Sequence, residues 1–275
     1  MHRKPKAFIK RYNRLLIGGT LLIFIILISV FAKLIAPYDP TATDVYNISA
    51  KPSSEHLLGT DSMGRDAFSR LIYGGRMSLL VGLGVGILSM SIGIVLGLIA
   101  GYYKKVDKIL MRIMDGISAF PSILLALLLF SIMEGGVFTV VFALSISAIP
   151  GITRLIRSSV LSVKEQEHVE SASAMGASDL RIMFQYILPL CSSPLLIRFT
   201  STTASAILSE ASLSFLGIGI LPTIPTWGNM LSEGRSYLLT APYLLYAPGI
   251  ATILTVISIN MIGDGLRDLL DTKLN

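Results

Sequence analysis

The sequence ESASAMGASDLRIMFQYILP, residues 170–189, is a polar interruption between two long apolar runs. Apolar residues near its start form one short helical face, and Gly176 suits the left-handed turn that ends a helix. Ser178 is a favourable N-cap for a second helix, in which apolar residues again recur at helical spacing. Pro189 marks the expected break before the next apolar run. The stretch therefore predicts two short amphipathic helices joined at a glycine, which suits a hydrophobic groove on a soluble partner.

The same stretch resembles the EAA loop of binding-protein-dependent ABC importer permeases, whose pattern is Glu-Ala-Ala, three residues, Gly, nine residues, Ile, one residue and Leu-Pro. Ser171 replaces the first alanine and Tyr186 stands where isoleucine is expected; the other pattern positions match. An ordinary amphipathic loop on the membrane surface is the alternative interpretation. The resemblance implies a cytosolic coupling loop at about residues 165–189 that contacts an ATPase subunit through Glu170, Ala172, Gly176, Ser178, Leu188 and Pro189.

Composition places the chain in a membrane. Apolar residues make up 52% of the 275 residues and charged residues only 15%, a balance that soluble domains of this length rarely show. The apolar residues form long runs, so the sequence predicts an all-α, multi-pass protein of the cell membrane. The net charge of +6 comes from basic residues in short loops beside these runs. No nucleic-acid-binding motif accompanies them, so we expect lipid rather than nucleic acid as the surrounding partner.

Six apolar runs predict six transmembrane helices, and the basic loops place both termini in the cytosol. The first run is longer than the core of a cleaved signal peptide, about 7–15 residues, which favours an uncleaved first span. We expect three divisions: a basic N-terminus with the first helix at 1–36, an extracytoplasmic segment at 37–75, and a five-helix permease core at 76–275. The predicted spans are residues 15–35, 77–101, 117–133, 137–152, 190–220 and 244–262.

Glycines recur in the second predicted span at multiples of about four residues. This small-residue spacing is typical of helices that approach one another closely in a membrane. A phosphate-binding loop is the alternative, but the sequence has neither a Walker A motif nor a GxGxxG motif. We therefore expect helix packing, and no ATP hydrolysis by this chain itself. The glycines are Gly82, Gly86, Gly93, Gly97 and Gly101.

Two ionisable residues, Arg198 and Glu210, fall in the fifth predicted span, among many hydroxyl side chains that include Ser205 and Ser209. Charged groups are costly in hydrocarbon and normally face a bundle interior or a water-filled path. The two residues would lie roughly 18 Å apart on one helix, so each needs a partner elsewhere. One hypothesis is that Arg198, Ser205, Ser209 and Glu210 line the translocation path; the other is that both charges are structural.

Three further stretches resemble one branch of the same permeases, which imports dipeptides, oligopeptides and nickel. They are HLLGTDSMGRDAFSRLIYGGRMSL at 56–79, AILSEASLSFLGIG at 206–219, and residues 222–242. Taken alone, Arg65 and Asp66 in the first stretch would indicate only a solvated turn. Trp227 and Tyr237 in the third belong to a predicted outer loop, where they would either meet a binding protein or act as membrane-interface anchors.

This resemblance implies the type I ABC importer permease fold. The chain would be one of two related permease subunits on two ATPase subunits, and an extracytoplasmic binding protein would deliver the solute. ATP and magnesium would bind to the ATPases, and we expect this chain to bind no cofactor or metal. The branch implies di- or oligopeptides as substrates, with nickel, a metal chelate or glutathione as alternatives.

Two other function classes explain the sequence less well. A secondary transporter or channel without ATPases often shows internal repeats and several intramembrane carboxylates, whereas Glu210 is the one acid well inside a predicted span. A membrane enzyme would need a metal or nucleophile arrangement, and His2, His56 and His168 are scattered without metal-ligand spacing.

Overall fold

The computed structural model describes residues 5–133 and 135–271, so Arg3 and Lys4 of the predicted basic N-terminus lie outside the described residues, as do residues 272–275 of the predicted core. Within the described ranges the chain is helical apart from its loops and one isolated β-bridge between Thr60 and Asp66. The α-helices are α1 (Pro5–Val30), α2 (Ala32–Ile35), α3 (Ala67–Tyr102), α4 (Lys104–Ser118), α5 (Ser122–Ile132), α6 (Val137–Val163), α7 (Glu167–Ala174), α8 (Asp179–Arg181), α9 (Ser192–Phe215), α10 (Trp227–Gly234) and α11 (Tyr243–Asp271).

Five stretches among the described residues are helical, long and apolar enough to cross a membrane: α1, α3, α6, the continuous segment of α8 and α9, and α11. The pair α4 and α5 makes a sixth crossing only if the two are counted together, because they are bent by 88°. Five of the six predicted spans are thus single helical stretches, and the remaining one is divided into two helices.

The predicted span at 117–133 is not one continuous helix. Pro121 stands between α4 and α5, where its missing N–H and its ring disfavour a continuous helix through the preceding residue. The 11 residues of α5 extend about 16 Å, whereas the hydrocarbon core is about 30 Å thick.

The helix of the fourth predicted span is longer than expected, because α6 continues beyond the predicted end at 152. Its last turns carry Arg154 and Arg157, which pair with Asp115 and Asp107 of α4.

Glycines in one half of α3 allow it to lie directly against α6. A Cβ atom added at Gly97 would stand 2.6 Å from Ile156 Cβ, a separation that real side chains do not adopt. Gly93 and Gly101, one turn to either side, would meet α6 side chains at 2.6 and 2.5 Å. The predicted role of these glycines in helix packing is therefore confirmed.

The same stripe of glycines turns toward a different helix in the other half of α3. Gly86 and Gly93 are seven residues apart and lie within about 20° of each other around the helix, so the partner changes because α9 and α6 contact α3 at different places along its length. Gly82 and Gly86 accordingly face α9, where added Cβ atoms would stand 2.6 Å from Ile207 Cγ1 and 2.6 Å from Thr203 Oγ1. α3 is thus the central helix on which both α6 and α9 pack.

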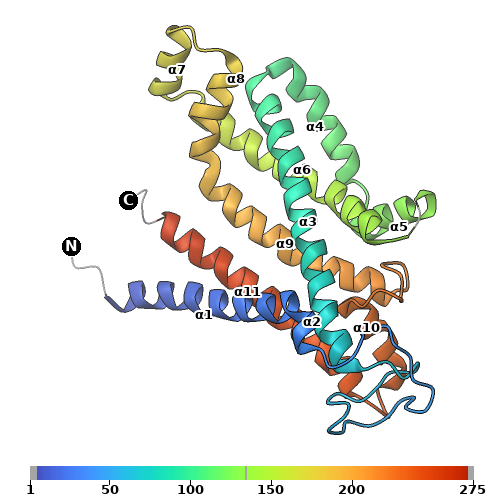
Figure 1. Ribbon diagram of the computed structural model, residues 1–275. Coiled ribbons are helices and arrows are strands. Elements are labelled where there is room, and N and C mark those ends of the chain that lie inside the picture. The colour runs from blue at the N-terminus through green and yellow to red at the C-terminus, as the bar shows by residue number, and fades with distance from the viewer. Residues whose placement is uncertain (1–4, 134, 272–275) are drawn as a thin grey trace.

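The two ends of the molecule carry different structures (Figure 1). At one end α7 and α8 lie beside the junction of α3 and α4, and the loop charges predict this end to be cytosolic. At the other end, the segment 37–66 lies near α10 and the start of α3. α1 packs along α11, which in turn packs on α9.

Trp227 does not serve at a surface, contrary to both roles considered for it. Its side chain is 3% exposed and packs beside Gly74 and Gly75 of α3, where a Cβ at Gly75 would stand 2.9 Å from the indole. The indole N–H donates to the Leu71 carbonyl oxygen at 3.0 Å. The tryptophan is buried because two consecutive glycines on α3 leave a slot for it.

We predict that Gly97→Val destabilises the protein while Gly116→Val does not. A side chain at Gly97 must displace Ile156, and overpacking of this kind costs about 1–3 kcal/mol or more. Gly116 lies on α4 with no atom within 4 Å of an added Cβ, so it controls for the change in helix propensity. The check is the thermal unfolding midpoint of each purified variant in detergent; equal midpoints would contradict the packing argument.

Candidate coupling loop and translocation cavity

The loop predicted to contact an ATPase is a helix pair joined at Gly176. α7 ends at Ala174, and Gly176 follows with φ +82°, the left-handed conformation that glycine adopts without strain. The Gly176 N–H donates to the Ser173 carbonyl at 3.0 Å, and the Ala177 N–H donates to the Ala172 carbonyl at 3.1 Å. These two bonds form a Schellman motif, so the predicted glycine turn is confirmed.

The second helix of the pair starts where expected, but its cap and its end differ from prediction. Ser178 occupies the N-cap position with extended backbone, yet its side chain makes no capping hydrogen bond in the described structure. The predicted break at Pro189 is wrong, because the chain stays helical from Asp179 to Phe215. A π-helical turn at Ile182–Ile187 and a 3-10 turn at Leu188–Cys191 change the helical pitch, which accommodates the proline ring and its missing N–H.

One face of the helix pair is part of the protein core. Val169 and Ala172 of α7 are buried, as are Ile182, Met183 and Ile187 after α8. All of these except Ala172 belong to one apolar cluster with Ile156 and Val160 of α6 and Leu98 of α3. The helix pair is therefore packed as a continuation of the membrane helices rather than attached as a loose loop.

The opposite face exposes large apolar side chains. Met175 is 79% exposed, Leu180 66% and Phe184 48%, and Glu170 is also exposed beside them in the chain. A shallow cavity of about 290 Å³ adjoins Glu170 and is lined also by Tyr102, Lys164, Glu165, Val169, Ser173 and Ile182. Apolar groups gathered at an aqueous end of a protein indicate a surface that a partner covers. We call Glu170, Met175, Leu180 and Phe184 the coupling surface.

A carboxylate holds this helix pair to the end of α3, which the sequence analysis missed. Asp179 accepts hydrogen bonds from the Tyr102 hydroxyl at 3.0 Å and from the Tyr103 hydroxyl at 2.7 Å. The hydrogen bond to the carboxylate raises the pKa of Tyr103 above its usual value, which keeps the phenol protonated as a donor. The signal in the sequence was two consecutive tyrosines at the end of the second apolar run, but nothing in it pointed to Asp179.

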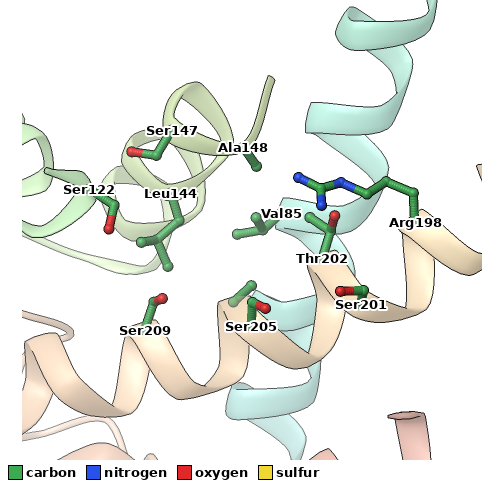
Figure 2. A pocket seen from close by; sticks show the side chains of 11 residues that line it. Val85, Ser122, Leu144, Ser147, Ala148, Arg198, Ser201, Thr202, Ser205 and Ser209 are labelled. Carbon is green, nitrogen blue, oxygen red and sulfur yellow. The ribbon is translucent and has the colours of Figure 1, made fainter. Parts of the chain in front are cut away.

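Arg198, Ser205 and Ser209 line one cavity of about 200 Å³ (Figure 2). Ser205 and Ser209 follow Arg198 by seven and eleven residues, which brings them to within about 20° of it around the helix. The α9 side of the cavity therefore carries an arginine followed by hydroxyls. The remaining lining residues are Val85, Ser122, Leu144, Ser147, Ala148, Ser201, Thr202 and Ala206.

Glu210 lies elsewhere, so the structure does not bring all four proposed path residues together. Twelve residues after Arg198, it points about 120° away around α9. It is fully buried and accepts hydrogen bonds from Ser214 Oγ at 2.9 Å and Ser78 Oγ at 3.4 Å. Ser78 Oγ also accepts a hydrogen bond from the backbone N–H of Trp227 at 3.3 Å. Glu210 thus joins α9 to α3 and, through Ser78, to α10.

Comparison with known proteins shows the family to which the chain belongs. Residues 93–275 match the family described as the inner membrane component of binding-protein-dependent transport systems, and residues 10–52 match the N-terminal transmembrane domain of oligopeptide transport permease C. The chain belongs to this permease family. It is accordingly a multi-pass inner-membrane permease of a binding-protein-dependent transport system.

Relatives of this permease match it over nearly their whole length. It is 43% identical over 264 residues to a putative peptide transport system permease of Brucella abortus, covering 96% of this chain and 89% of that one. It is 44% identical to a glutathione transport system permease of Pectobacterium atrosepticum (94% and 86% covered). It is 40% identical to a di/tripeptide transport system permease of Pseudomonas aeruginosa (96% and 89% covered).

The fold is that of a type I importer permease. The structure superposes on a chain of the inward-facing MetNI methionine ABC transporter with a TM-score of 0.62, covering 74% of this chain and 97% of that chain. At 18% sequence identity this likeness concerns the fold alone.

The outer end of the permease contains a buried charge network where a solvated turn was the simplest interpretation. Arg65 and Arg70 are 5% and 1% exposed. Arg65 pairs with Asp61 at 2.7 Å and with Glu233 of α10 at 3.0 Å. Arg70 pairs with Glu233 at 3.1 Å and with Asp61 at 3.4 Å. The network joins the segment before α3, α3 itself and α10, whose acidic member is 168 residues away from Arg65 in the chain.

Asp66 caps the N-terminus of α3, although the sequence taken alone indicated only a solvated turn. Its carboxylate accepts from the Ser69 N–H at 2.7 Å, the hydrogen bond that an N-cap side chain makes. Its other oxygen lies 2.9 Å from His56 Nδ1. His56 is therefore part of this cap. No group of three or more potential metal ligands occurs among the described residues.

We predict that Arg70→Met lowers stability more than Arg76→Met. Removing one partner of a buried ion pair leaves an uncompensated charge and costs about 3–5 kcal/mol, with the lower value expected because the Glu233 side chain is 24% exposed. Arg76 is an exposed arginine six residues further along α3. Unfolding midpoints in detergent check the difference, and a smaller loss for Arg70→Met than for Arg76→Met would refute it.

Proposed function

We propose that this permease is one of two related membrane subunits of a type I ABC importer that moves di- or oligopeptides into the cell. A second permease subunit completes the membrane domain, two ATPase subunits bind its cytosolic end, and a solute-binding protein delivers peptide from outside. ATP and magnesium bind to the ATPases, and this chain binds no cofactor of its own. Relatives named as peptide, di/tripeptide and glutathione permeases support the substrate class.

The observation that carries the ATPase partnership is the two-faced helix pair around Gly176. Its inner face is packed with α3 and α6, and its outer face presents Met175, Leu180 and Phe184. A groove on an ATPase subunit would bury these side chains, whose exposure to water is otherwise unfavourable. Because the inner face is rigidly packed, a displacement of the outer face moves α3 and α6 with it. Of the predicted contact residues, Ala172 is buried and so shapes the helix pair from within.

Transport then depends on two states of the membrane helices. ATP-driven movement of the ATPases shifts the equilibrium between inward and outward openings by binding one state better than the other. The cavity beside Arg198, Ser205 and Ser209 is the part of the path that this chain contributes. Glu210 is not assigned to the path, because it is buried between α3, its own helix α9 and Gly228 in the first turn of α10.

The chemistry of the cavity discriminates among substrates. A guanidinium repels a bare divalent cation, and the described lining residues include hydroxyls but no carboxylate, imidazole or thiol. Bare nickel is therefore disfavoured. Glutathione is a second candidate, because it is a peptide with carboxylate groups and a permease named for it is 44% identical to this one.

We predict that Gly176→Val abolishes peptide-stimulated ATP hydrolysis by the assembly, reconstituted in lipid with its binding protein, while the permease still inserts. No atom lies within 4 Å of an added Cβ, so the cost comes from the left-handed backbone, about 1–2 kcal/mol. That strain distorts the turn that sets the two helices of the coupling surface.

Gly217→Val is the matched control for this variant. Gly217 has φ +79°, equally open surroundings and the same pair of Schellman hydrogen bonds, but it ends α9 far from the coupling surface. Peptide stimulation should survive there. Equal loss in both variants would show a general folding defect, and normal stimulation in Gly176→Val would contradict the coupling role. Stimulation of the wild type by nickel alone would overturn the peptide assignment.

We predict that Glu170→Lys weakens the association of ATPase subunits, measured by their recovery with the tagged permease. Glu170 is exposed and lines the 290 Å³ cavity beside α7, so a reversed charge opposes a partner that complements the present one. Glu167→Lys makes the same change on the same helix at a residue that does not line this cavity. Equal recovery of ATPase with the two variants would count against a contact at Glu170.

A further inference from the structure

We propose that Arg198 and Thr202 form an anion site in the translocation cavity and that its ligand is a carboxylate of the transported peptide. This inference rests on the proposed function for the identity of the substrate, but its evidence is the geometry of α9 and α6.

Arg198 is a charged group without a partner. Within the described residues its guanidinium makes no ion pair or hydrogen bond, although its Nε is shielded from solvent. Arg65, Arg70, Arg154 and Arg157, by contrast, pair with carboxylates. An ionised group at this depth is costly unless it is paired or faces a polar cavity. Arg198 faces such a cavity, so its guanidinium is available to a ligand there.

Thr202 supplies a second unused donor in the same place. One helical turn after Arg198, it is 7% exposed, lines the cavity, and its Oγ1 has no hydrogen-bond partner among the described residues. Figure 2 shows its hydroxyl on the side of α9 from which the Arg198 side chain extends. A carboxylate has two oxygens and can accept bonds from a guanidinium and from a hydroxyl at once.

The facing helix leaves room for the guanidinium. Arg198 extends from α9 across the cavity toward Ala148 of α6 (Figure 2). Gly151 lies at the tip, and a Cβ atom added there would overlap Arg198 Nη2. The absence of a side chain at this position lets the cation reach into the cavity rather than fold back along α9.

The positive charge of Arg198 in the cavity favours the binding of an anion. Its described lining includes six hydroxyl side chains, at Ser122, Ser147, Ser201, Thr202, Ser205 and Ser209, and no acidic residue. Hydroxyls tolerate either charge, but the unneutralised guanidinium favours a carboxylate over an ammonium group or a metal cation. The volume of about 200 Å³ admits the carboxyl end of a peptide with adjoining atoms. We expect the peptide ammonium group to be bound elsewhere in the importer.

The experiment measures peptide binding to the complete, nucleotide-free importer in lipid nanodiscs without its binding protein. Calorimetric titrations compare trialanine with trialanine amide, which differs only in the lost carboxylate charge. The wild type should bind trialanine about tenfold or more tightly, as expected for a charge-assisted hydrogen-bonded site. R198Q should bind both peptides equally, and R198K should keep part of the preference because it keeps the charge but not the planar fork.

Two further variants test the geometry. Gly151→Ala keeps the charge but displaces the guanidinium, so it should reduce the preference for the carboxylate. Arg76→Gln removes an exposed arginine of α3 outside the cavity and should leave the preference unchanged.

Equal binding of the two peptides by the wild type, no measurable binding of either, or a preference that persists in R198Q would each overturn the proposal. Separation of the two permease subunits in R198Q, with rescue by R198K but without peptide preference, would instead assign Arg198 to an acidic residue of the partner. Peptide-stimulated ATP hydrolysis by the wild type tests the importer independently, so its persistence alongside any of these results would reject the anion site alone.

Discussion

The close approach of α3 to α6 and α9 is the constraint on which the rest of the structure depends. It exists because glycines at four-residue steps remove the side chains that would hold these helices apart. The contact with α6 carries the apolar cluster that anchors the coupling surface. The contact with α9 positions the helix that bears Arg198. A single helix therefore connects the end where an ATPase would bind with the wall of the cavity that Arg198 lines.

Charge pairing divides the ionisable groups of the membrane region by role. Arg65 and Arg70 are neutralised within the chain and hold the outer end together. Glu210 is buried among hydroxyl donors and joins α9 to α3. Arg198 differs from all of these, because it faces a cavity and has no partner in the described chain. In a medium that penalises unpaired charge, that difference separates a ligand-binding role from a structural one.

Local signals predicted the elements well and their junctions poorly. The glycine turn at Gly176 needed only backbone conformation and was correct. Pro121 was placed inside a span but breaks it, whereas Pro189 was expected to end a helix and lies within one. A proline in the sequence indicates only that one backbone N–H is missing and that its ring restricts the local backbone. Whether the chain bends, as before α5, or changes pitch, as before α9, depends on which neighbouring helices pack against it.

The sequence by itself determined the membrane class, the approximate spans, the glycine packing helix and the turn at Gly176. The signals for these features, which are apolar periodicity, composition and glycine spacing, act between residues that are close in the chain. Only the tertiary structure decided which ionisable groups are paired. Arg65 and Arg70 pair with Glu233 across more than half of the chain, and Glu210 turns away from Arg198 because a helix rotates by about 100° per residue. Pairing across such distances is a property of helix packing, which no local pattern specifies.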